Sequence, residues 1–102
     1  MELKNGVKVH GLSNEIMLAV FVCIGVYEKY GEELVITSIT DGQHSGTSLH
    51  YSGNAIDIRT RYFDEKEIEV VAGDIRSRLT GDYDIVVEKT HIHIEYQPRY
   101  SE

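Results

Sequence analysis

The sequence predicts an α+β domain with a small antiparallel sheet packed on helices. Two helical patterns and four short strand patterns follow one another in the order α-β-β-α-β-β, with the strands in adjacent pairs. A length of 102 residues fits a single domain, 1–102. A hydrophobic content of 41% and a charged content of 26% are ordinary for a globular chain, so disorder is not expected.

Each helix has a recognisable start. Ser13 is an N-cap candidate with Glu15 in the first turn, and the apolar pattern after it ends before Gly31. The middle of this segment is apolar almost all round, which predicts a buried central helix. The second helix spans 64–79, where Asp64 is the cap. Its apolar stripe consists of Ile68, Val71, Ile75 and Leu79.

The strand segments are short and rich in β-branched residues. The second of them alternates polar and apolar residues, so Ile56 and Ile58 would point into the core. Ala55, Asp57 and Arg59 would then share the open face. The four predicted strands are 34–37, 54–59, 84–88 and 90–95.

The last strand places two histidines on one face. His91, His93 and Glu95 alternate with Ile92 and Ile94, so the two imidazoles should lie side by side on the open side of the sheet. A histidine pair at this spacing is a weak signal by itself, because a strand histidine is more often a surface or core residue than a ligand.

A second segment supplies further candidate ligands. His50 and Asp57 are seven residues apart and are separated by a turn signal at 52–54. Two histidines and one aspartate form a nitrogen–oxygen set that suits Zn²⁺ with an open fourth position, as in catalytic sites. The two segments together are far more restrictive than either alone, and they predict a zinc site.

These segments resemble a known family. Segment 48–57, SLHYSGNAID, resembles the SxHxxGxAxD motif of the M15 metallopeptidases, which include D-Ala-D-Ala carboxypeptidases and L-alanyl-D-glutamate endopeptidases. Segment 91–93, HIH, resembles the second half of that signature. Segment 44–58 is also similar to Hedgehog signalling domains, which share the fold and the zinc. The resemblance implies a Hedgehog/DD-peptidase-like fold with Zn²⁺ as cofactor.

The resemblance also implies residue roles. His50, Asp57 and His93 are the implied zinc ligands, because in HxH members the second histidine is the ligand. His91 would then support its neighbour or stabilise an oxyanion. Glu88, at the end of the preceding strand, is the expected catalytic base. Glu88 lies three residues before His91, the spacing that many members show before their ligand, so a register with His91 as the ligand stays open.

Three further residues are candidates for substrate binding: His44, Ser48 and Arg59. His44 would line the cleft or be a plain loop residue, and Ser48 would hydrogen-bond the turn. Members that cleave cell-wall peptides often carry an arginine in an SGYRS-like stretch, whereas the corresponding segment 37–42 has none. Arg59 shares a face with Asp57 and would take over carboxylate binding.

Composition bounds the partners. A formal charge of −7 argues against nucleic acid, whose binders need a basic face. The apolar run 17–26 is shorter than the roughly 20 residues that span a bilayer, and no cleavage site follows it, so neither membrane insertion nor an export signal is expected. Cys23 is the single cysteine, which excludes an intrachain disulfide. We expect a monomer.

The favoured function is a zinc peptidase that hydrolyses peptidoglycan stem peptides, as a carboxypeptidase or an endopeptidase. The small size and the missing export signal resemble phage endolysin domains, which stay in the cytoplasm until released and then act on the cell wall. Two alternatives are a non-catalytic Hedgehog-like zinc-binding interaction domain and a virion-associated structural protein with a relic site.

Overall fold

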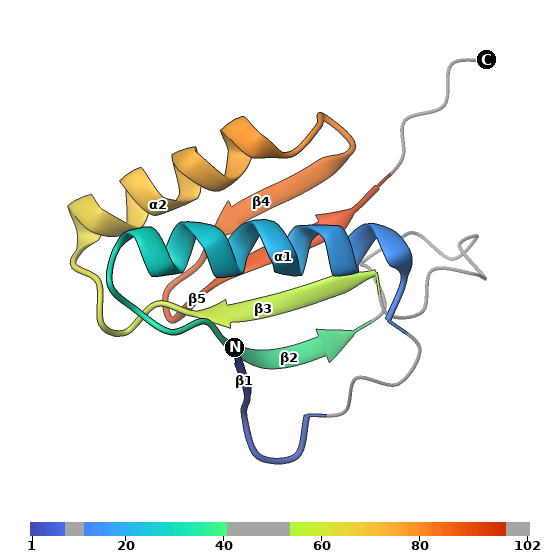
Figure 1. The fold of residues 1–102 in the computed structure, drawn as a ribbon, viewed down its shortest axis with the longest axis horizontal. Helices are drawn as coiled ribbons and strands as arrows, with labels where there is room; N and C mark the ends of the chain where they lie inside the picture. Colours follow the sequence, from blue (N-terminus) through green and yellow to red (C-terminus); the bar gives the residue numbers. More distant parts are fainter. Residues whose placement is uncertain (8–11, 41–53, 98–102) are drawn as a thin grey trace.

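The computed structural model describes residues 1–7, 12–40 and 54–97 (Figure 1). Its elements follow the order β-α-β-β-α-β-β. They are β1 (Glu2–Leu3), α1 (Asn14–Lys29), β2 (Val35–Thr40), β3 (Ala55–Arg59), α2 (Glu65–Arg78), β4 (Tyr83–Val87) and β5 (His91–Tyr96).

The strands form one five-stranded sheet in the order β1-β2-β3-β5-β4. The pairs β2–β3, β3–β5 and β4–β5 are antiparallel, as the sequence predicts. Strand β1 pairs in parallel with the start of β2, with Glu2 opposite Val35. The α+β class is therefore confirmed, but the sheet is mixed rather than purely antiparallel.

Both helices cover the same face of this sheet, and the hydrophobic core lies between the two layers (Figure 1). Alternate strand residues point into that core, because side chains along a strand project to opposite faces. The intervening residues of β3 and β5 therefore project from the face that the helices leave uncovered. The buried isoleucines of the sheet are Ile36, Ile56, Ile58, Ile85, Ile92 and Ile94.

Local capping determines where the helices begin. The Ser13 side chain accepts a hydrogen bond from the Ile16 amide (3.1 Å) at the start of α1, and Gly31 follows its end with a positive φ of 79°. At α2, Asp64 Oδ1 accepts from the Glu67 amide (2.8 Å) while the Asp64 amide donates to Glu67 Oε1 (2.9 Å). This is a capping box, which satisfies two amides that the helix leaves unpaired. In the described part of the chain, neither helix is long and apolar enough to cross a membrane.

Candidate functional site

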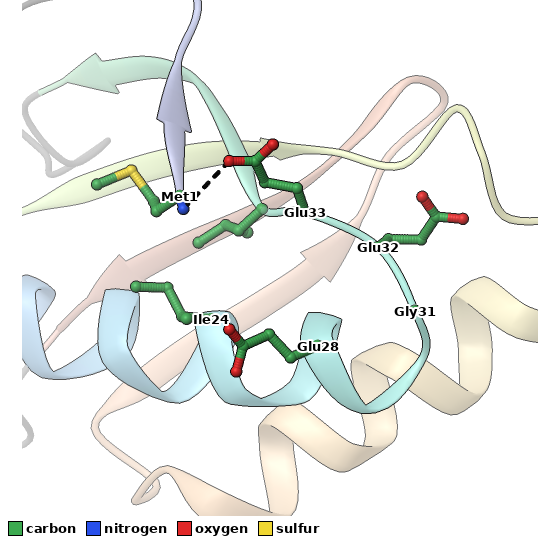
Figure 2. Close-up of a pocket in the computed structure, with 7 residues that line it drawn as sticks. Met1, Ile24, Glu28, Gly31, Glu32 and Glu33 are labelled. Carbon is green, nitrogen blue, oxygen red and sulfur yellow. Dashed lines mark ion pairs between the residues drawn. The ribbon is translucent and has the colours of Figure 1, made fainter.

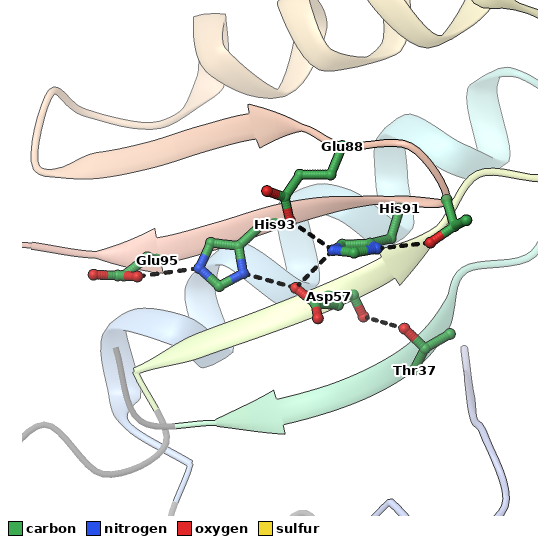
Figure 3. Close-up of polar contacts among 7 residues, drawn as sticks. Thr37, Asp57, Glu88, His91, His93 and Glu95 are labelled. Atoms are coloured by element: carbon green, nitrogen blue, oxygen red, sulfur yellow. Dashed lines mark hydrogen bonds and ion pairs between the residues drawn. The ribbon is translucent and has the colours of Figure 1, made fainter. Parts of the chain in front are cut away.

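Asp57 and His93 face each other across two neighbouring strands. They are directly opposed in the β3–β5 register, and Asp57 Oδ1 lies 2.7 Å from His93 Nδ1 (Figure 3). Antiparallel pairing brings them together although they are 36 positions apart in the sequence. Both side chains project from the uncovered face of the sheet and are about one fifth exposed, at 21% and 20%.

The second histidine lies beside the first. His91 Nε2 is 3.6 Å from Asp57 Oδ1 and 2.8 Å from Glu88 Oε1, while His91 Nδ1 is 3.0 Å from Thr90 Oγ1 (Figure 3). A ring protonated on Nε2 satisfies these contacts, since Nε2–H donates to Glu88 and Nδ1 accepts from the Thr90 hydroxyl. Glu88 follows β4 at the turn into β5, which directs its carboxylate toward Nε2 of His91 (Figure 3).

A buried carboxylate holds the other nitrogen of His93. Glu95 Oε1 lies 3.1 Å from His93 Nε2, and Gln97 Nε2 donates to Glu95 Oε2 (2.7 Å). Burial of the His93 ring favours its neutral form, but the hydrogen bonds to Glu95 and Asp57 and the charges of both carboxylates outweigh burial. The net effect is to raise the pKa of His93 above its ordinary value. In this arrangement each ring nitrogen donates to a carboxylate.

A β-bulge adjoins the strand that carries Asp57. The β2–β3 register shifts between Ile36 and Ser38, which places Thr37 at the irregularity. Thr37 Oγ1 donates to the main-chain carbonyl of Asp57 (3.3 Å; Figure 3). Bulges re-aim side chains and are frequent beside functional sites, and here the extra contact fixes the backbone that carries the aspartate.

One end of this face differs from expectation. Ala55 was predicted to lie on an open face, yet it is fully buried, and its β5 partner Glu95 is only 4% exposed. The alternation of the sequence assigns a residue to a side of the sheet, but it does not indicate whether that side is covered. The exposed part of the face therefore begins at Asp57 and continues toward Arg59.

The predicted site residues divide into two groups. His44, Ser48 and His50 lie outside the described residues. The remaining predicted residues are brought onto one face by β3, β5 and the turn before β5. They are Asp57, Arg59, Glu88, His91 and His93.

The sequence assigned no role to Glu95 and Thr90, which contact the rings of His93 and His91 and complete the histidine network of Asp57, Glu88, Thr90, His91, His93 and Glu95. Glu95 was placed on the same face as His93, and the HxHxE spacing was the available signal for a contact between them. Thr90 directly precedes His91, and its contact with the ring arises from the turn conformation, which the sequence pattern does not encode.

The donor set around Asp57 fits zinc chemically. Two ligand atoms on a tetrahedral zinc lie about 3.3 Å apart, given bonds of about 2.0 to 2.2 Å. Asp57 Oδ1 and His93 Nδ1 lie 2.7 Å apart, a hydrogen-bond distance, so they would move apart by about 0.6 Å to bind one zinc. Residues 1–7, 12–40 and 54–97 contain no group of three or more His, Cys, Asp or Glu side chains arranged to hold a metal. The predicted set includes His50, which lies beyond those ranges.

A separate pocket lies at the end of α1 and contains no residue of this network. The N-terminal amine of Met1 pairs there with Glu33 (3.4 Å), and Glu28 and Glu32 line the same pocket (Figure 2). Its charged side chains are all carboxylates, so it is chemically distinct from the face that carries the histidines.

No protein-family model matches the chain, and no curated protein is significantly similar to it.

Proposed function

We propose that the chain is a metal-dependent hydrolase whose site lies on the uncovered face of the sheet, around Asp57 and His93. More particularly, we propose a zinc peptidase with a Hedgehog/DD-peptidase-like fold that hydrolyses peptidoglycan stem peptides. The single observation that supports this most is the direct pairing of Asp57 with His93 (2.7 Å). Asp57 comes from the first half of the M15-like motif and His93 from the second half. The two side chains are in contact although 36 positions separate them in the sequence.

His50, Asp57 and His93 would hold the zinc. Bound zinc supplies a Lewis acid that polarises a carbonyl and lowers the pKa of a bound water to about 7. The chain's contribution is to fix the ligands. Glu95 accepts a hydrogen bond from His93 Nε2 and so orients the ring with Nδ1 toward Asp57. Carboxylates in this position set the tautomer of a ligating histidine and raise its basicity.

Proton transfer is assigned to Glu88, and stabilisation of the oxyanion is assigned to His91. The Glu88 side chain is about half exposed, at 49%. Its carboxylate contacts His91 Nε2, the ring nitrogen that also faces Asp57. A carboxylate here can accept a proton from an attacking water and return it to the leaving amine. His91 Nε2–H donates to Glu88 in this structure, and it would have to turn from Glu88 to donate to the oxygen that becomes negative as the amide carbonyl is attacked.

The test uses one substitution and a matched control. Purified wild type, Glu88→Gln and Glu69→Gln are supplied with zinc and incubated with isolated peptidoglycan, and the soluble fragments are identified by mass spectrometry. Glu69 is an exposed carboxylate on α2, the layer on the opposite side of the sheet. We expect wild type and Glu69→Gln to release the same stem-peptide fragments. Glu88→Gln should bind zinc normally and release at least a hundredfold less, the usual effect of losing an acid–base residue.

The same experiment separates the alternatives. Zinc binding without cleavage of peptidoglycan from several sources would overturn the peptidase and favour a non-catalytic Hedgehog-like domain. Weak zinc retention without cleavage would favour a virion-associated structural protein with a relic site. Equal cleavage by wild type and Glu88→Gln would remove Glu88 from the mechanism.

A further inference from the structure

One side of α1 carries large apolar side chains that are exposed. Leu18 and Phe21 are 54% and 63% exposed, and Met17 beside them is exposed as well. They lie on a helix whose sequence is apolar almost all round, and such a helix is normally buried on every side. The hydrophobic core covers the other side of α1. A cluster of large exposed apolar side chains on a water-soluble fold indicates a surface for a partner.

An apolar pocket formed by α1, β1 and β2 adjoins these side chains. Its volume is about 130 Å³, and all of the described residues that line it are apolar. Met17, Phe21 and Ile24 lie on one face of α1, because they are four and three positions apart. The pocket therefore continues the exposed apolar side of α1 toward the sheet. The strand residues that line it are Leu3, Ile36 and Ile39.

The acidic pocket at the end of α1 extends this apolar surface (Figure 2). The two pockets share Met1 and Ile24. Glu28 lies one turn after Ile24 on the same face of α1, and Glu32 follows the end of the helix. Within residues 1–7, 12–40 and 54–97, neither carboxylate forms an ion pair. We call the two pockets together the α1 groove, which is apolar from Met17 to Ile24 and acidic at Glu28 and Glu32.

The α1 groove has the length of a short helix. Met17 and Glu28 are eleven positions apart, which at 1.5 Å per residue is about 16 Å along α1. A partner helix of about three turns covers that length. Apolar grooves bind amphipathic helices through apolar anchors three and four positions apart. Carboxylates at one end of the groove select a helix whose apolar stripe is followed by lysine or arginine.

The same carboxylates argue against two other occupants. A second copy of the chain would bring its own Glu28 and Glu32 to the interface, where they would meet like charges or apolar side chains. An anionic lipid surface would repel them, in a chain of formal charge −7. A basic segment instead supplies a counter-charge to each carboxylate.

We propose that the α1 groove binds a helix of a partner protein. The partner's apolar side chains pack against Met17, Phe21 and Ile24. Its basic side chains pair with Glu28 and Glu32. Because α1 lies on the helical side of the sheet, opposite the face that carries the histidine network, a partner bound here leaves that face free (Figure 1). The inference is therefore independent of the proposed peptidase.

The test uses three synthetic helical peptides. The first carries leucines three and four positions apart, followed by three lysines. The second has glutamates in place of the lysines, and the third has alanines in place of the leucines. Each is titrated at constant ionic strength into the full ¹⁵N-labelled chain, and amide shifts are followed by NMR. We expect saturable shifts from the first peptide alone, centred on Phe21, Ile24, Glu28 and Glu32.

Two variants with matched controls test the two halves of the α1 groove. Phe21→Ser should bind the first peptide at least about tenfold more weakly, since it removes a central aromatic anchor. Val70→Ser removes a similarly exposed apolar side chain from α2 and should bind as wild type does. Glu28→Gln should weaken binding about threefold through the loss of charge complementarity. Glu69→Gln removes the same charge from an exposed position on α2 and should leave binding unchanged.

Several results would overturn this proposal. These are the absence of saturable binding, equal binding of the glutamate or the alanine peptide, and equal weakening by the control variants. A peptide-free dimer that light scattering detects and that Phe21→Ser abolishes would instead identify a second copy as the occupant. Binding to phosphatidylglycerol vesicles that Phe21→Ser abolishes, without peptide binding, would instead identify a lipid surface.

Discussion

At the residue scale, His93 is held by a carboxylate on each ring nitrogen. Asp57 contacts Nδ1 and Glu95 contacts Nε2. Glu95 is almost completely buried and is held in turn by Gln97. Burying a carboxylate costs free energy unless the group is hydrogen-bonded. The hydrogen bonds to His93 and Gln97 offset this cost, and we infer that Glu95 orients the His93 ring. Among the described residues, the carboxylate closest to His91 is Glu88, which is about half exposed, so we propose His93 rather than His91 as the ligand.

The role of Glu95 leads to a prediction about metal affinity. Substitution Glu95→Ala should weaken zinc binding about 10- to 100-fold, the usual effect of removing the partner of a ligating histidine. Competition with a chelator of known affinity measures this. Glu95→Gln keeps a hydrogen-bond acceptor and should recover part of the affinity. Unchanged zinc affinity in Glu95→Ala would show that Glu95 only fills space.

Cys23 yields a second prediction at this scale. It is fully buried in α1, and burial raises the pKa of its thiol to about 12. Because the thiolate is the reactive form, the folded protein should resist iodoacetamide at mildly alkaline pH and become fully alkylated in denaturant. Mass spectrometry of both samples measures the modification. Rapid, complete alkylation of the native protein would mean that α1 opens readily.

At the scale of elements, the capping box of α2 can be tested by substitution. Asp64→Ala removes the side-chain acceptor for the Glu67 amide and should destabilise the protein by about 1 kcal/mol. Urea denaturation gives the free energy of unfolding. Lys66→Ala, at an exposed position two residues after the cap, should change it by less than about 0.5 kcal/mol. An equal effect of the two substitutions would show that the cap contributes nothing specific.

The predictable elements are those whose signals are local. The positions at which the two helices begin, after Ser13 and Asp64, were predicted because a cap and its partner lie within three residues of each other. Strand β1 was not predicted, because Glu2–Leu3 is a strand only by virtue of pairing with β2, over thirty residues later. The bulge at Thr37 could likewise not be predicted, because it is a property of the β2–β3 register.

The same distinction applies to the site. The alternation of β3 and β5 predicted that Asp57, His91 and His93 share a face, and they do. It could not predict which aspartate oxygen faces which ring nitrogen. The burial of Ala55 also depends on contacts between distant segments.

At the scale of the whole molecule, one ion-pair cluster connects the two helices. Asp74 on α2 accepts from Lys29 at the end of α1 (2.9 Å) and from Arg78 one turn further along α2 (3.0 Å). The hydrogen bonds from Lys29 and then Arg78 hold the pKa of Asp74 below its ordinary value of 3.8. The packing of α1 against α2 is thus stabilised partly by these ion pairs.

This cluster makes stability depend on pH in a defined direction. Because the folded-state pKa of Asp74 is lowered, its contribution is present above pH 3.8 and is lost as the pH falls below that value. Asp74→Asn should therefore lower Tm at neutral pH, and the difference from wild type should shrink in acid. Glu69→Gln serves as the control, since it removes an exposed carboxylate that forms no ion pair within the described ranges of the chain. A constant difference at all pH values would contradict this account.

The most direct test of the central claim is the zinc content per chain after removal of loosely bound metal. It is measured by mass spectrometry of the metal in wild type, Asp57→Ala, His93→Ala and His91→Ala. The account predicts one zinc per chain in wild type and in His91→Ala, and loss of zinc in Asp57→Ala and His93→Ala, with all four folded by circular dichroism. Wild type without zinc after zinc is supplied, or zinc retained by Asp57→Ala and His93→Ala, would contradict it.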